Sequence, residues 1–179
     1  MSKATQGDEK RVGEYFKQIE ALRSGVDSSV ERLTEMWDDD GVFEFCGAPP
    51  LNARYTGKVA IKTLYKNRLH ANGMEVKLDG ESAKMLKEGE VTLSTVKTDV
   101  NRVRAHDGKM VAGWTTLVGT HQGVGFNVSG SHTFTFRDGR ITSLKVVISP
   151  KADDAANLRL EGLSVNDIGR LALAAWPVV

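Results

Sequence analysis

Residues 109–148, KMVAGWTTLVGTHQGVGFNVSGSHTFTFRDGRITSLKVVI, decide the fold of this chain. They predict three consecutive strands, because polar and apolar residues alternate and a strand points successive side chains to opposite faces. In the middle strand the apolar face carries Phe126, Val128, Gly130, His132, Phe134 and Phe136. His132 is the single ionisable group on that face, so it is the first candidate for a functional residue.

The sheet extends beyond this stretch. Residues 90–105 alternate in the same way and predict a long strand that turns back at Asp107-Gly108, and a second such turn stands at Asp138-Gly139. Residues 74–78 predict a further short strand. Residues 90–149 are therefore expected to form one antiparallel meander, curled around the helices that precede it.

Helical spacing of apolar residues predicts three helices ahead of the sheet. The first follows a polar, frayed start at residues 1–8 and buries Val12, Tyr15, Phe16, Ile19 and Leu22. The second begins with a capping box of Ser28 and Glu31 and buries Val30, Leu33, Met36 and Trp37. It is expected to end at the solvated acids Asp38, Asp39 and Asp40, with Gly41 as its stop. The third starts at Gly57 and buries Ile61, Leu64, Tyr65 and Leu69.

Helices followed by a meander of strands predict an α+β fold. We expect a curved antiparallel sheet wrapped around the N-terminal helices as a cone-shaped barrel, with a helical extension at the C terminus. The whole chain, residues 1–179, is expected to be one domain, with its core at about 10–149 and the extension at 150–179. The apolar stripe of that extension is expected to cover either the mouth of the cone or a partner subunit.

Composition excludes several classes of protein. The 24 Lys and Arg nearly balance the 23 Asp and Glu, and the basic residues are scattered, so we expect no nucleic-acid partner. No apolar run reaches the length of a membrane span or of a signal peptide, so we expect no membrane partner. Cys46 is the single cysteine and excludes an internal disulfide. The expected location is the cytoplasm.

Several motifs together resemble one family. The segments W-DDDGVFEF, YTGKVAIKTLY, GTHQG and SHTFTFRDGRI are similar to the nuclear-transport-factor-2-like superfamily, and within it to the branch of SnoaL-like polyketide cyclases and ketosteroid isomerases. The resemblance implies a cone with an apolar cavity and a homodimer packed through the outer face of its sheet. We expect no metal, because three consecutive acids at 38–40 point in different directions, and no cofactor, because no strand–GxGxxG–helix motif is present. Both acids of ketosteroid isomerases are replaced, by Phe45 and His132, whereas the histidine of the cyclase GTH motif matches His121.

Three residues are candidate catalytic groups. An imidazole takes or gives a proton near neutral pH, so His132 is a candidate proton carrier and His121 its helper. Tyr15 lies on the inner stripe of the first helix, where the resemblance implies a catalytic tyrosine. The alternatives stay open: His132 as a buried histidine bonded to a neighbouring element, His121 as part of the sheet edge, and Tyr15 as a core residue.

Apolar residues are expected to form the walls around these groups. The candidate ligand-binding residues are Phe43, Phe45, Tyr55, Trp114, Phe126, Phe134, Leu144 and Val146. Such a cavity suits a hydrophobic polyketide-, terpenoid- or steroid-like molecule, on which an acid–base isomerase, cyclase or dehydratase would act. The alternative is a non-catalytic binding or dimerisation module of the same fold.

Overall fold

A computed structural model describes residues 3–46, 53–67, 69, 75–77, 90–120 and 125–149. The elements, in chain order, are α1 (Lys3–Arg23), α2 (Ser28–Glu35), β1 (Trp37–Cys46), β2 (Ala53–Thr56), α3 (Lys58–Lys66), β3 (Glu75–Lys77), β4 (Glu90–His106), β5 (Lys109–Thr120), β6 (Gly125–Arg137) and β7 (Arg140–Ser149). The predicted α+β class is confirmed. The predicted extension at 150–179 lies outside the described residues, and the single-domain assignment stays a prediction.

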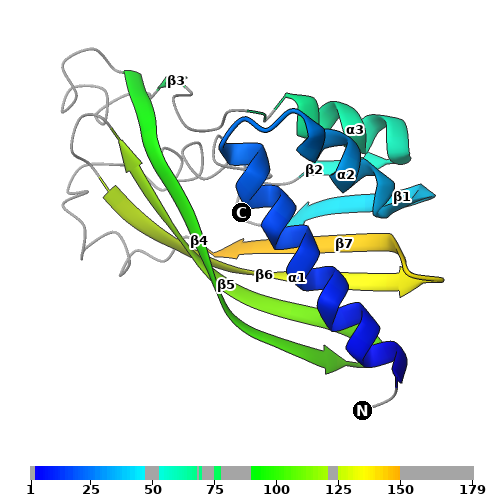
Figure 1. The fold of residues 1–179 in the computed structure, drawn as a ribbon. Helices are drawn as coiled ribbons and strands as arrows, with labels where there is room; N and C mark the ends of the chain where they lie inside the picture. Colours follow the sequence, from blue (N-terminus) through cyan, green and yellow to red (C-terminus); the bar gives the residue numbers. More distant parts are fainter. Residues whose placement is uncertain are drawn as a thin grey trace.

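The strands form one sheet in the order β2-β1-β7-β6-β5-β4-β3. The meander from β4 to β7 is antiparallel, as predicted. Its two sharp turns have the positive φ angles that tight hairpins require, 49° and 71° at Asp107-Gly108 and 51° and 77° at Asp138-Gly139. Figure 1 shows β4 and β5 as long, strongly bent strands, which gives the sheet a concave face.

Two features of the sheet correct the sequence prediction. First, β1 pairs parallel with β7, so the sheet is mixed and not wholly antiparallel. A hairpin requires antiparallel strands, but β1 and β7 are far apart in the chain and are free of that constraint. Second, the strand order runs from β2 at one edge to β3 at the other, so the cone is an open sheet and not a closed barrel.

Helix α1 crosses the concave face of the sheet, while α2 and α3 lie beside each other at its β1–β2 end (Figure 1). The inner face of α1 buries Val12, Tyr15, Ile19 and Leu22, as its apolar stripe predicted, whereas Phe16 is half-buried. The helix begins at Lys3, earlier than expected from the polar start. Near this start, Arg11 forms an ion pair with Asp8, one helical turn earlier, at 2.8 Å, and such a pair stabilises the N-terminal part of the helix.

The end of the second helix is corrected. Helix α2 ends at Glu35, and Trp37 begins β1 opposite Ile141, whose amide donates to the Met36 carbonyl at 2.8 Å. Trp37 is fully buried in the strand, and an apolar residue at this position was equally consistent with the buried face of a helix or of a strand. The acids that follow therefore lie on a strand and not at a helix end.

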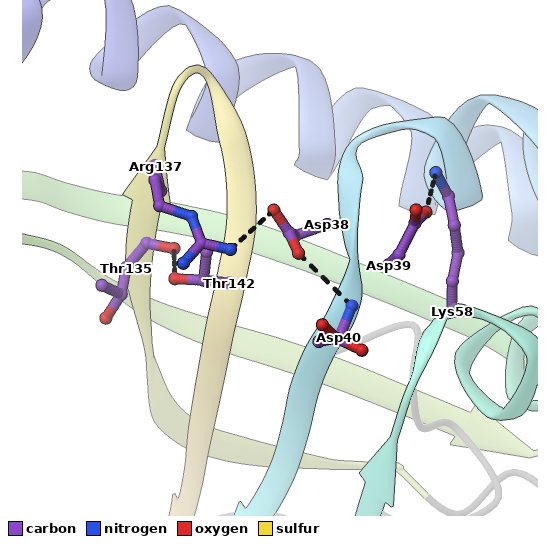
Figure 2. A network of polar contacts seen from close by, with 7 residues as sticks. All are labelled: Asp38, Asp39, Asp40, Lys58, Thr135, Arg137 and Thr142. Atoms are coloured by element: carbon purple, nitrogen blue, oxygen red, sulfur yellow. Dashed lines mark hydrogen bonds and ion pairs between the residues drawn. The ribbon is translucent and has the colours of Figure 1, made fainter.

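Figure 2 shows how these acids anchor the start of β1. Asp38 accepts from Arg137 at the end of β6, at 3.1 Å, and from the backbone amide of Asp40. Asp39 faces a different neighbour and pairs with Lys58 at the start of α3, at 3.5 Å. The pairs are surface contacts and each contributes little to stability, but they connect the start of β1 to the end of β6 and to the start of α3.

The predicted capping box is wrong. Asp27 occupies the N-cap of α2 and makes no side-chain cap, and Ser28 is the first residue of the helix. The Glu31 carboxylate instead pairs with Lys62 of α3, and this hydrogen bond lowers its pKa. The local motif predicted that Glu31 would cap its own helix, but the ammonium group of Lys62 on the neighbouring helix binds this carboxylate instead. Helix α3 itself buries Ile61, Leu64 and Tyr65, as predicted, but it ends at Lys66, so that Leu69 lies beyond the helix and is half-buried.

Candidate functional site

Pairing across the strands places the predicted wall residues Phe43, Phe45, Phe134, Leu144 and Val146 in two neighbouring rows on the inner face of the sheet. One row runs Phe43–Leu144–Phe134–Met110 and the next runs Phe45–Val146–His132–Ala112, each across β1, β7, β6 and β5. These side chains are all at most 4% exposed. The alternation predicted for β6 therefore holds at His132 and Phe134, whose side chains point to the core under α1.

His132 is fully buried and hydrogen-bonded within the sheet. The indole Nε1–H of Trp114 donates to His132 Nδ1 at 2.6 Å. Burial, assisted by the positive charge of Arg23, lowers the pKa of His132 to about 3, so the ring is neutral at physiological pH. Because an indole N–H can only donate, His132 Nδ1 must accept through its lone pair and carries no hydrogen. The hydrogen of the neutral ring is therefore on Nε2.

Aromatic rings surround the imidazole. The ring centroids of Phe16, Trp114, Phe134 and Tyr15 lie 5.0, 5.7, 5.8 and 5.9 Å from that of His132. Two of these rings belong to α1 and two to the sheet, so His132 lies where the helix packs on the concave face. This packing limits the rotation of the imidazole.

Tyr15 belongs to a second buried hydrogen-bonded group. Its hydroxyl lies 3.2 Å from that of Tyr65 on α3, and Tyr65 accepts from the indole Nε1–H of Trp37 at 3.0 Å. All three side chains are fully buried. Burial raises the pKa of both tyrosines, and for Tyr15 the neighbouring Tyr65 raises it further, so both hydroxyls stay protonated. Each can serve as a hydrogen-bond donor at neutral pH.

A buried guanidinium adds positive charge near His132. The Arg23 side chain at the end of α1 is 2% exposed, and its Nη2 donates to Thr98 Oγ1 on β4. Thr98 Oγ1 in turn lies 2.7 Å from Thr116 Oγ1 on β5. Burial lowers the pKa of Arg23 to about 10, opposed by Glu20, so the group keeps its charge at neutral pH.

The other predicted site residues do not lie in the two rows, and two of them are described in part or not at all. Tyr55 is half-buried on β2 opposite Phe43 and lines a hollow of about 430 Å³ beside α3, with Ala60, Thr63, Leu64 and Asn67. His121 lies outside the described residues. For Phe126 only the strand position is described, opposite Val118. Another hollow of about 450 Å³ lies between α2, β1 and α3 and is lined by Thr34, Asp39, Gly57, Lys58, Val59 and Lys62.

Sequence reasoning missed Arg23, Tyr65 and Trp37 as polar groups of the interior. Arg23 comes four residues after Ile19, so it continues the inner stripe of α1. Only its positive charge suggested that the side chain would be exposed to solvent. Tyr65 and Trp37 were expected to be buried, but their polar atoms were not expected to meet Tyr15. A buried tyrosine and a buried tryptophan usually require a hydrogen-bond partner, and this was the available signal.

The arrangement presents neutral donors in an apolar setting. Among the described residues no cluster of three His, Cys, Asp or Glu side chains could hold a metal ion. The polar side chains buried in the described part are Gln18, Arg23, Ser29, Thr34, Thr116 and His132, which include no carboxylate. Hydroxyl and imidazole N–H groups at such a site suit the stabilisation of negative charge that develops on an oxygen.

Comparison with known proteins identifies the fold. No protein-family model matches the chain, and no curated protein matches it. A candidate isomerase from Bacillus subtilis is similar in structure, with 24% identity, a TM-score of 0.53, and coverage of 80% of this chain and 89% of that chain. A candidate SnoaL-like polyketide cyclase from Shewanella putrefaciens has 11% identity, a TM-score of 0.54, and coverage of 87% and 97%.

An NTF2-like protein of unknown function from Exiguobacterium is similar to the same degree. It has 16% identity, a TM-score of 0.54, and coverage of 78% of this chain and 98% of that chain. The chain therefore has the nuclear-transport-factor-2-like fold, as its motifs predicted. None of the helices in the described part has the length and apolar character needed to cross a membrane.

Proposed function

We propose that this chain is a cofactor-independent acid–base enzyme, an isomerase, cyclase or dehydratase, acting on a hydrophobic small molecule that carries a carbonyl group. One observation carries the proposal: Tyr15 and His132 are buried side by side, with ring centroids 5.9 Å apart, within the aromatic wall between α1 and the sheet. Removal of a proton beside a carbonyl places negative charge on its oxygen, and two neutral donors stabilise that charge.

The roles of the histidines follow from the hydrogen bond between Trp114 and His132. Since His132 Nδ1 accepts from the indole, this nitrogen is not the base, and His132 acts with Tyr15 as a donor to the substrate oxygen. The proton carrier is then His121, the histidine of the GTH motif, which follows β5 directly in the sequence. The aromatic and aliphatic rows on the inner face would contact the substrate skeleton.

The names of the similar proteins support the same class of reaction. A candidate isomerase and a candidate SnoaL-like polyketide cyclase share this fold. The fold also occurs in proteins of unknown function, so the fold alone does not assign catalysis. The assignment depends on the buried donors of this chain.

Exchange of hydrogen for deuterium tests the proposal without knowledge of the product. The protein is incubated in D₂O with hydrophobic cyclic ketones and 1,3-diketones, and deuterium beside the carbonyl is measured by mass spectrometry. We expect exchange above the protein-free rate, reduced by about 10²-fold in Tyr15→Phe, His132→Phe and His121→Ala. The exposed His106 provides the control, and His106→Ala should retain the exchange rate.

A non-catalytic binding module is the second candidate, favoured by the complete burial of Tyr15 and His132. This candidate predicts that ketones bind, as measured by calorimetry, while no variant and no condition gives exchange above the protein-free rate. That result would overturn the catalytic proposal.

The proposal includes a homodimer in the cytoplasm. Its interface would be the outer face of the sheet, where Thr115, Ser129, Ser131 and Thr133 present small polar side chains from β5 and β6. Light scattering coupled to gel filtration should give twice the mass of the chain, and Thr133→Arg should give the monomer. Thr63→Arg on the exposed side of α3 is the matched control and should leave the mass unchanged.

A further inference from the structure

Trp114 and Gly130 face each other directly across β5 and β6. The indole lies against the Gly130 backbone so closely that an added Cβ would overlap its six-membered ring and the Val147 carbonyl oxygen. Gly130 is in ordinary extended conformation, so the glycine is required here for space and not for its dihedral freedom. Its missing side chain allows the indole to lie across β6.

The position of the indole determines where its N–H points. Trp114 is the diagonal neighbour of His132, because Trp114 pairs with Gly130 and Ala112 pairs with His132. Diagonal neighbours on one face of an antiparallel pair are within reach of long aromatic side chains. The indole nitrogen consequently reaches His132 Nδ1 at 2.6 Å, with both rings buried.

We infer that Trp114 and Gly130 are positioning residues that hold His132 in the tautomer with its hydrogen on Nε2, so that any ligand atom meeting Nε2 must be an acceptor such as a carbonyl or enolate oxygen. The tautomer follows from the donor-only character of the indole N–H. The neighbouring rings of Phe16 and Phe134, at 5.0 and 5.8 Å, hold the imidazole in the orientation that keeps this bond.

The consequence for a ligand deepens the proposed function and rests on it. A ketone or enolate oxygen can accept from Nε2–H, whereas an ammonium group, which only donates, would face another donor. Arg23, whose positive charge acts on His132, disfavours a cation in the same way. The tautomer itself, by contrast, is a property of the protein without any ligand.

Nuclear magnetic resonance of the full chain labelled with ¹⁵N-histidine tests the tautomer directly. In the unaltered protein at neutral pH, His132 should show a protonated Nε2 and an unprotonated Nδ1. In Trp114→Phe the hydrogen bond to Nδ1 is lost, so the Nδ1 signal should shift and the share of the Nδ1–H tautomer should rise. Gly130→Ala should produce the same change by displacing the indole. Trp37→Phe removes a different buried indole and should leave the His132 signals unchanged.

The outcomes separate this inference from the proposed function. A His132 with its hydrogen on Nδ1, or a His132 spectrum that Trp114→Phe leaves unaltered, would overturn the inference. If Gly130→Ala does not fold, Trp114→Phe alone decides. If the tautomer is found but no ketone exchanges deuterium in any variant, the positioning role stands and the catalytic proposal fails.

Discussion

The burial of His132 predicts a specific dependence of stability on pH. The pKa of His132 is lowered from 6.5 to about 3 in the folded protein, first by burial and then by the charge of Arg23. Between these values the unfolded chain binds a proton that the folded chain does not bind. The stabilising contribution of neutral His132 is thus fully present above the unfolded pKa and is lost as the pH falls.

The magnitude can be worked out for pH 5. Each pH unit over which only the unfolded state holds the proton lowers the free energy of unfolding by about 1.4 kcal/mol. Because pH 5 is roughly 1.5 units below the unfolded pKa, His132 should lower the free energy of unfolding by about 2 kcal/mol relative to pH 7. The result depends little on the folded pKa, provided that this stays well below 5.

Urea denaturation at the two pH values measures the effect. His132→Asn keeps an amide oxygen that can accept from Trp114 but cannot be protonated, so its loss of stability between pH 7 and pH 5 should be smaller than that of the unaltered protein by about 2 kcal/mol. The matched control is His106→Asn at an exposed histidine, which should lose as much as the unaltered protein. Equal losses in all three proteins would refute a buried, neutral His132.

Two further predictions concern β1. Gly41→Ala should destabilise the fold by about 1–3 kcal/mol, because the new Cβ would lie 2.5 Å from the Trp37 ring, whereas Gly113→Ala, with open space around it, should not; urea denaturation compares the two. Burial and the neighbouring Glu44 raise the pKa of the Cys46 thiol, so at pH 8 iodoacetamide should modify it more slowly than free cysteine, as followed by mass spectrometry.

The sheet could be predicted because its signals are local and repeated. Alternation along β6 predicts which side chains face inward, and the Asp-Gly pairs predict where the strands turn. Both signals depend on a strand and its immediate neighbour. The inward faces of His132 and Phe134 followed from these signals alone.

The parts that could not be predicted depend on contacts between distant segments. Trp37 begins a strand because β7, which follows about 100 residues later in the chain, offers a parallel partner. Glu31 leaves the predicted cap because Lys62 lies on the neighbouring helix. The role of Trp114 is also non-local, since it requires both the register of β5 on β6 and the missing side chain of Gly130.

The hydrogen bonds of Tyr65 and Tyr15 distinguish a structural hydroxyl from a functional one. Tyr65 bonds both Tyr15 and Trp37, so Tyr65→Phe leaves two buried polar groups without their partner, whereas Tyr15→Phe leaves at most one and keeps the Trp37 bond. A buried polar group without a partner costs about 1–3 kcal/mol. Tyr65→Phe should therefore be more destabilising than Tyr15→Phe by about 1–3 kcal/mol in urea denaturation. Equal losses of stability would contradict the central position of Tyr65. If Tyr15→Phe abolishes deuterium exchange while the protein keeps most of its stability, the Tyr15 hydroxyl serves a bound molecule more than the core.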